Sequence, residues 1–185
     1  LGLNKNLGLF PHGAFSPRNT PWPRTIGPSD SPVIGCHGFF FRHKGIDKLI
    51  KAAAIMKRQW PGLRLRLVNA RFPGKEHDQT ILEAQSLAKD LGLENSIDWH
   101  LDFLPVDEIE ELLGGCDIIA LPYDESDDSA SGAVRTSLAT MVPLVATRVQ
   151  IFAELEGAVA WAENNDPAEL ANVISELIKS TAKRR

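Results

Sequence analysis

The chain has 185 residues, and 43% of them are hydrophobic, which is enough for one domain with a real core and short for two. Its formal net charge of −4 and its isoelectric point near 5.7 disfavour a nucleic-acid surface, because binding a phosphate backbone requires concentrated Lys and Arg. We therefore expect a single compact unit that does not bind nucleic acid.

The pattern of apolar residues argues against a membrane protein. No uninterrupted apolar stretch approaches the roughly 18 to 20 residues that cross a bilayer, and the first residues lack the basic-then-apolar order of a signal peptide. The two cysteines, Cys36 and Cys116, both lie in apolar runs, which favours buried thiols in a reducing compartment. We therefore expect a cytoplasmic protein without a transmembrane segment. The chain begins at Leu1 rather than at a methionine, so we also expect a fragment or a processed protein.

The first 32 residues differ in composition from the remainder. They hold six of the twelve prolines, and only residues 7–10 resemble a strand. Such a segment connects domains rather than forming a core. We therefore expect residues 1–32 to be a connecting segment and residues 33–185 to form the folded domain.

From residue 33 onward, short apolar runs alternate with helical patterns. The apolar runs predict six strands, of which the second is half-buried and close to a sheet edge. Six strands alternating with helices predict an α/β fold, a doubly wound parallel sheet flanked by helices. The expected strands are 33–36, 63–68, 96–101, 116–121, 143–147 and 158–162. The expected helices carry the apolar positions of 46–56, 81–91, 109–113, 149–155 and 170–178, and a further helix that begins with small residues lies between the fourth and fifth strands.

The last helix has the firmest local signal. Asp166 is suited to the N-cap, Pro167 to the first helical position, and Glu169 to the third position of a capping box. We therefore expect this helix to begin at residues 166–167.

Residues 121–147 are the best place for chemistry. Here a buried strand, an acidic loop, a helix beginning with small residues and a second strand follow one another. In open α/β sheets, ligands bind beyond the carboxyl ends of strands, and a helix N-terminus there offers unpaired N–H groups and partial positive charge. This stretch therefore predicts a site that suits a phosphate group.

Several side chains near this stretch allow two interpretations. Lys44 either binds an anion between a strand and a helix or is a solvated lysine. The acidic run of residues 124–128 is more typical of a surface loop than of a magnesium site, because it lacks a fixed ligand spacing. Ser129 and Ser131 suit helix caps rather than nucleophiles. Arg135 would be solvated by default.

The histidines and phenylalanines give weaker signals. The five histidines are scattered without the spacing of zinc ligands. His37 is placed in the loop after the first strand, where a structural role is favoured over a ligand contact. Residues 39–41 are three consecutive phenylalanines, which favour anchoring the loop or contacting another domain over stacking on a base.

Three spaced features resemble the C-terminal domain of glycosyltransferases with two Rossmann domains (the GT-B architecture), in particular the large retaining group typified by family 4. Residues 38–45, GFFFRHKG, are similar to the family's G-R-x-x-x-x-K-G loop. Residues 117–147 follow the order of the family's strand, small-residue helix and next strand. Residues 165–170 resemble the start of its late helix, and residues 11–13 the turn at its domain crossing.

The resemblance implies a nucleotide-diphosphate sugar held at the carboxyl ends of these strands. It therefore makes residues 33–185 a Rossmann-like nucleotide-sugar-binding domain and residues 1–32 an interdomain linker. It matches the family's lysine to Lys44, but the family's arginine falls on Phe39, so that Arg42 and Arg135 become candidates to replace it. The family's two glutamates, eight positions apart, fall on Asp128 and Thr136. Glu154 matches a later acidic residue, to which we assign little weight.

The predicted site therefore combines two roles. Asp128 and Lys44 are the candidate catalytic residues, the carboxylate acting on the sugar and the ammonium on the departing diphosphate. The donor would be a substrate, with no metal or other cofactor expected, and the upstream acceptor-binding domain would be a partner outside this chain. The candidate donor-binding residues are Gly38, Lys44, Ser131, Gly132, Ala133, Arg135 and Thr136.

Two other functions stay open. The first is a degenerate domain that binds a nucleotide, a sugar or a protein partner without catalysis, which Phe39 and Thr136 favour. The second is a doubly wound nucleotide-binding domain of different chemistry. The sequence contains no G-x-G-x-x-G or G-x-x-x-x-G-K-S/T motif, which argues against this function.

Overall fold

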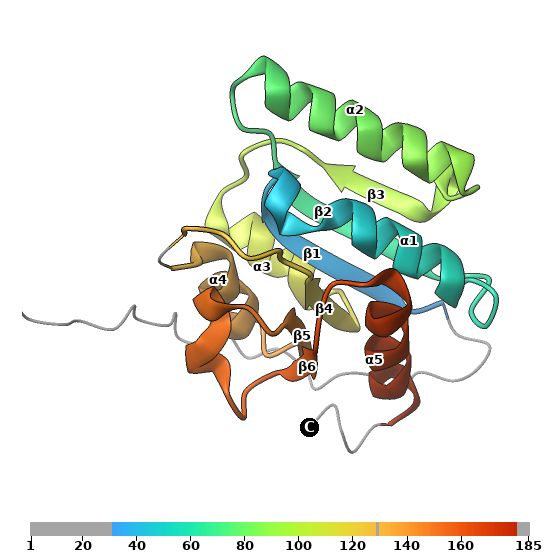
Figure 1. The fold of residues 1–185 in the computed structure, drawn as a ribbon. Coiled ribbons are helices and arrows are strands. Elements are labelled where there is room, and N and C mark those ends of the chain that lie inside the picture. The colour runs from blue at the N-terminus through green and yellow to red at the C-terminus, as the bar shows by residue number, and fades with distance from the viewer. Residues whose placement is uncertain (1–30, 129, 181–185) are drawn as a thin grey trace, which may run out of the picture.

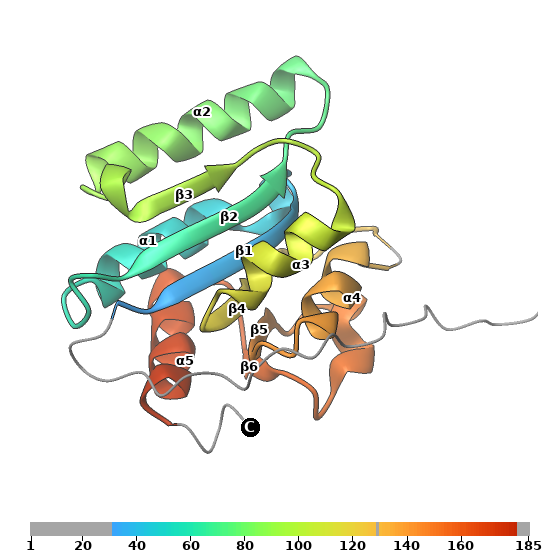
Figure 2. The same cartoon turned by 180° about the vertical axis from the view of Figure 1, so that it is seen from behind.

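A computed structural model describes residues 31–128 and 130–180 of the protein and shows one six-stranded sheet between two layers of helices (Figures 1 and 2). Every strand pairing is parallel, and the strand order is β3-β2-β1-β4-β5-β6. This confirms the predicted α/β doubly wound fold and places the second strand next to the edge. The strands are β1 Val33–Phe39, β2 Arg64–Ala70, β3 Ile97–His100, β4 Ile118–Leu121, β5 Leu144–Thr147 and β6 Ala160–Ala162.

The helices divide between the two faces of the sheet. In Figure 1, α1 and α5 lie before the central strands, whereas Figure 2 brings α3 and α4 to the front. Helix α2 packs against α1. The helices are α1 Ile46–Met56, α2 Lys75–Asp90, α3 Val106–Gly114, α4 Gly132–Ala139 and α5 Pro167–Lys179, with 3-10 turns η1 Arg42–Lys44, η2 Glu94–Ser96 and η3 Gln150–Leu155.

Alternation along the strands gives each face its own core. In β4, Ile118 and Ala120 join the apolar cluster under α1 and α5, whereas Ile119 and Leu121 join the cluster under α3 and α4. All four residues are buried, as a parallel strand covered on both faces requires. This two-sided burial is why the strand reads as a continuous apolar run in the sequence.

Several predicted boundaries differ from the structure. Strand β1 continues past Cys36 to Phe39, because it pairs with β2 in register from Val33 to Phe39. Helix α2 begins at Lys75, six residues before the helical pattern that we predicted from residue 81. Strands β4 and β6 are each two residues shorter at their start than predicted, and the short helix before β6 is a 3-10 turn. Such end effects depend on pairing and capping more than on apolar periodicity.

The start of α5 confirms the predicted N-cap and corrects the capping box. Asp166 Oδ1 accepts hydrogen bonds from the N–H groups of Ala168 at 2.9 Å and Glu169 at 3.3 Å. The reciprocal bond is absent among the described residues, because the Asp166 N–H donates to Asn164 Oδ1 and Glu169 accepts from the Glu163 N–H. The cap therefore closes through Asp166, and Glu169 ties the helix to the preceding loop.

The remaining expectations about chain organisation concern residues that are not described. The predicted linker 1–32, the strand-like residues 7–10 and the turn at 11–13 lie outside the described residues except for positions 31 and 32. The domain division therefore stays a prediction. Among the described residues, none of the helices is long and apolar enough to cross a membrane.

Gly45 should be the glycine that the fold tolerates least well when replaced. It has φ +65°, and a Cβ atom there would lie 1.9 Å from the carbonyl oxygen of Pro122. We expect Gly45→Ala to lower the free energy of unfolding by about 3 kcal/mol or more, because backbone strain adds to a clash. Gly92→Ala is the matched control: its φ is +68° with no atom within 4 Å of the new Cβ. That variant should lose only about 1 kcal/mol in urea denaturation, and equal losses would contradict the clash.

The two cysteines should be unreactive in the native protein. Both are free and buried, and burial raises the pKa of Cys36 and of Cys116 to about 12. At pH 8 the reactive thiolate fraction would then be about one in ten thousand. We expect a disulfide reagent to label neither thiol at pH 8 without denaturant and both in guanidinium chloride. Rapid labelling of the native protein would show that one of them is accessible.

Candidate functional site

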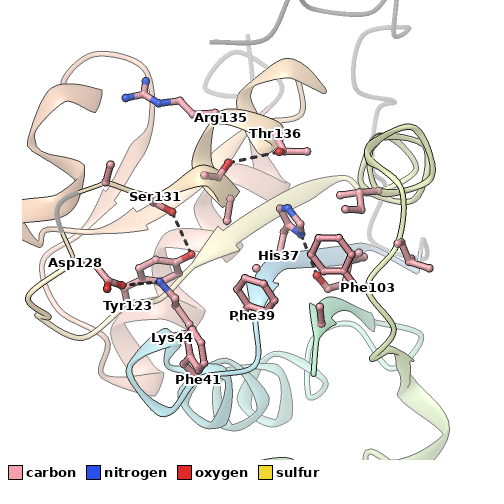
Figure 3. A pocket seen from close by; sticks show the side chains of 18 of the residues that line it. His37, Phe39, Phe41, Lys44, Phe103, Tyr123, Asp128, Ser131, Arg135 and Thr136 are labelled. Atoms are coloured by element: carbon pink, nitrogen blue, oxygen red, sulfur yellow. Dashed lines mark hydrogen bonds and ion pairs between the residues drawn. The ribbon is translucent and has the colours of Figure 1, made fainter. Parts of the chain in front are cut away.

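The predicted site residues surround one cavity of about 480 Å³ at the carboxyl ends of the strands (Figure 3). Its walls come from the end of β1, the turn η1, the loop before α3, the loop after β4 and the first turns of α4. The structure thus brings together residues far apart in the chain, although their roles in binding stay predictions. The predicted residues that line it are Gly38, Lys44, Asp128, Ser131, Gly132, Ala133, Arg135 and Thr136.

Lys44 is buried, which rules out a solvated surface lysine. Its side chain is only 9% exposed, and its Nζ lies 4.0 Å from the centroid of the Tyr123 ring. Nζ donates a hydrogen bond to Asp128 Oδ2 at 3.3 Å. Burial lowers the pKa of Lys44, and the Asp128 carboxylate partly opposes this effect. The ammonium is therefore poorly hydrated and favours a nearby anion.

Asp128 is shared between two residues of the η1 turn. Its Oδ2 lies 3.3 Å from Lys44 Nζ and 3.1 Å from His43 Nε2. Partial burial acts to raise the pKa of Asp128, but the charges and hydrogen bonds of Lys44 and His43 outweigh it and hold this pKa below its usual value. The carboxylate is therefore ionised at neutral pH.

The N-terminus of α4 lies beside this ion pair, with Ser131 at the N-cap. We expected the serine side chain to cap the helix, but it makes no capping hydrogen bond, and its Oγ lies 3.5 Å from the Tyr123 hydroxyl. A side chain at Gly38 (φ +133°) would meet Ala133 and Tyr123 at 3.4 Å. Glycine at this position thus keeps β1 close to the first turn of α4, whose leading N–H groups lack partners within the helix.

Neither candidate for the second cation reaches the ion pair at Lys44. Arg135 is buried, contrary to the expected solvation, and pairs with Glu154, which we had given little weight. In Figure 3 the Arg135 guanidinium points away from Lys44. Arg42 lies outside the cavity lining and donates to Glu83 on α2 at 2.9 Å. Among the described residues, Lys44 and Arg135 are thus the cations that line this cavity, and they belong to separate ion pairs.

Thr136 lies on the cavity side of α4 without contributing charge. Its hydroxyl is directed back along the helix, 3.5 Å from the carbonyl oxygen of Gly132 (Figure 3). A threonine in this position replaces the carboxylate that the resemblance implies.

Four phenylalanines form a cluster beside the cavity, and three of them, Phe39, Phe41 and Phe103, line it. Sequence reasoning anticipated this cluster only in part. Phe39, Phe41, Phe72 and Phe103 are linked by ring-centroid distances of 5.2 to 6.0 Å. Phe40 points to the other face and packs in the core. Phe103, whose exposed fraction is 80%, was missed, because a lone aromatic in a loop carries no sequence signal.

His37 lies within β1, not in the loop after it as predicted. It lines the cavity, and its Nδ1 lies 3.0 Å from the Val68 carbonyl oxygen. Burial lowers the pKa of His37, so that the imidazole is neutral at pH 7. The ring therefore adds a polar but uncharged group to the cavity floor.

The acidic loop fastens neighbouring segments rather than forming a metal cluster. Asp124 accepts from the Asn165 amide, and Glu125 accepts from the Gln150 N–H at 3.2 Å. Within residues 31–128 and 130–180, no group of three or more His, Cys, Asp or Glu side chains is placed to hold a metal ion. The expected independence from metal stays a prediction.

Comparison with known proteins identifies relatives that match most of this chain. The family model described as "Glycosyl transferases group 1" matches residues 22–185. D-inositol 3-phosphate glycosyltransferases from Corynebacterium urealyticum and Corynebacterium kroppenstedtii are each 26% identical to the chain, over 168 and 163 residues. Each match covers 87% of this chain but only 38% and 36% of the relatives. The chain therefore spans less than two-fifths of these relatives.

Solved structures show the same fold at low sequence identity. Anabaena HepE in complex with UDP has a TM-score of 0.71 and 24% identity, with 83% of this chain and 41% of that chain covered. The C-terminal domain of the group 1 family protein LpcC from Francisella tularensis has a TM-score of 0.68 and 17% identity, with 85% and 83% covered. The predicted likeness to a C-terminal domain of GT-B architecture is thus confirmed.

The ion pair between Arg135 and Glu154 should stabilise the wall of the cavity. Removing the Glu154 charge leaves a guanidinium that is 11% exposed without its anion. We expect Glu154→Gln to lower the free energy of unfolding by about 1 to 3 kcal/mol. Glu156→Gln is the control, because Glu156 pairs with the more exposed Arg148 and should cost less than about 1 kcal/mol. Equal losses of stability in urea denaturation would show that the buried Arg135 does not depend on Glu154.

Proposed function

Because the chain belongs to the glycosyl transferases group 1 family, we propose that it is the donor-binding half of a glycosyltransferase. This half would hold a nucleotide-diphosphate sugar while the sugar moves to an acceptor. The acceptor-binding domain is proposed to precede this unit in the parent chain. The relatives support a second domain of this kind, because the region that matches this chain makes up less than two-fifths of each relative.

One observation carries this proposal: the buried Lys44 ammonium and the N-terminus of α4 border the same cavity. Both supply positive electrostatic potential, and both lie where open α/β sheets bind ligands. The Anabaena structures are described with UDP and with UDP-glucose bound, which makes a uridine diphosphate sugar the first donor to test.

The chemistry expected of the site follows from charge development. When the bond between sugar and diphosphate breaks, negative charge grows on the departing oxygen. Lys44 and the first N–H groups of α4, from Gly132 and Ala133, are proposed to stabilise that charge without reorganising. Asp128 is proposed to contact sugar hydroxyls or the positive centre of the sugar. We propose that no metal takes part.

The residues at the cavity also support a second function, which is binding without catalysis. Phe39 and Thr136 replace a cation and a carboxylate, and both arginines near the site have carboxylate partners. A domain that binds the nucleotide sugar without transferring it would fit these replacements. Turnover of a donor by the parent protein, measured with and without this domain's Lys44, separates the two functions.

Replacing Lys44 should weaken binding of the donor. We expect Lys44→Met to raise the Kd for UDP about tenfold or more by isothermal titration, because a charge-assisted hydrogen bond contributes roughly 1.5 to 3 kcal/mol. Lys48→Met is the matched control, since Lys48 lies in the first turn of α1 beside Asp47 and does not line the cavity. If UDP or GDP bound both variants as it binds the unmodified chain, Lys44 would not be the phosphate contact.

A further inference from the structure

The cation of the proposed anion site already has an anion. Lys44 Nζ lies 3.3 Å from Asp128 Oδ2, although the two residues are 84 positions apart. Figure 3 shows the Asp128 carboxylate reaching across the cavity wall to this ammonium. We propose that Asp128 is an internal counter-ion that occupies Lys44 in the free protein and is displaced by the phosphate groups of the ligand. The inference rests on the proposed function of the cavity.

Burial makes the two partners unequal. The Lys44 side chain is 9% exposed and its ammonium lies over the Tyr123 ring, whereas the Asp128 side chain is 46% exposed. A buried ammonium without an anion is costly, but a half-exposed carboxylate regains water when it turns away. Asp128 is therefore the partner that leaves, and Lys44 stays in position to receive the phosphate.

His43 contacts the same carboxylate as Lys44. Its Nε2 lies 3.1 Å from the same Asp128 oxygen, and its ring stacks on Phe41 at a centroid distance of 5.6 Å. Asp128 is thus held at the cavity by two neighbouring residues of the turn η1. The turn ends at Gly45, whose close approach to Pro122 joins it to the segment after β4.

Displacement makes anion binding an exchange. A ligand phosphate gains Lys44 only as Asp128 loses it, so the ion pair lowers affinity for every ligand that uses this cation. The exchange also releases the carboxylate beside the bound diphosphate, where it is free to contact the sugar. A ligand without phosphate leaves the pair intact.

The test separates this exchange from simple repulsion between a carboxylate and a phosphate. UDP and GDP are titrated into the 185-residue chain, into Asp128→Asn, and into both backgrounds carrying Lys44→Met. With Lys44 present, Asp128→Asn should tighten binding about three- to tenfold, the range expected for losing a partly exposed ion pair. In the Lys44→Met background the same change should alter affinity less than about twofold, because no pair remains to break.

Asp127→Asn is the matched control. It makes the same charge change one position away on the same loop, and Asp127 does not line the cavity. Its effect on the Kd should stay below about twofold, because an exposed charge is screened by salt. Uridine should bind the Asp128→Asn variant and the unmodified chain equally.

Three results would overturn the inference. An unchanged or weaker affinity of Asp128→Asn for both diphosphates would show that Asp128 does not compete for Lys44. A gain of the same size in the Lys44→Met background would assign the effect to repulsion alone. Both results leave nucleotide binding in place. Failure of every variant to bind either diphosphate at millimolar concentration would overturn the counter-ion and the proposed function together.

Discussion

The chain leaves β1 and β4 in opposite directions, and this divergence determines where the cavity lies. The two strands are parallel neighbours, but β1 continues into α1 on one face of the sheet and β4 into α4 on the other. Their connections therefore separate at the carboxyl edge instead of covering it, and ligands bind at such a switch point in open α/β sheets. The cavity, the buried Lys44 and the N-terminus of α4 all follow from this divergence.

Within the described part of the chain, both cations that line the cavity are paired with carboxylates. Lys44 is matched by Asp128 and Arg135 by Glu154, and both cations are far more buried than their partners. A fold can keep a buried cation at low cost only if an anion is close, so each pair stabilises the empty site. The same pairing reduces the positive charge that is free to attract an anion, and our proposal makes phosphate affinity depend on the displacement of a carboxylate.

Local signals predicted most of the fold, and contacts between distant residues account for what they missed. The cap of α5 needs only Asp166 and the two residues that follow Pro167, so four letters of sequence suffice. Lys44 was also identified locally, from its place between a strand and a helix. Its pairing with Asp128 spans 84 positions and depends on the β1–β4 alignment, which no periodicity specifies.

Arg135 shows why the nature of a side chain does not settle its environment. An arginine near a helix start is solvated by default, but this one lies beneath η3, which carries Glu154 19 positions later. The phenylalanine cluster also depends on contacts between distant residues, because Phe39, Phe72 and Phe103 follow or end three different strands. Each is an ordinary aromatic residue in its own segment, and only the shared edge of the sheet makes them neighbours.

The phenylalanines that line the cavity affect how strongly the Lys44 ammonium attracts anions. Phe39 occupies the position of an expected arginine, and with Phe41 and Phe103 it presents apolar surface to the cavity that Lys44 faces. Apolar walls reduce the local dielectric response, which strengthens the attraction between the remaining ammonium and any anion that reaches it. They equally strengthen its attraction to Asp128. In the proposed binding of phosphate, the Lys44 ammonium therefore serves both the internal Asp128 carboxylate and the phosphate, and competition between these two anions controls the affinity.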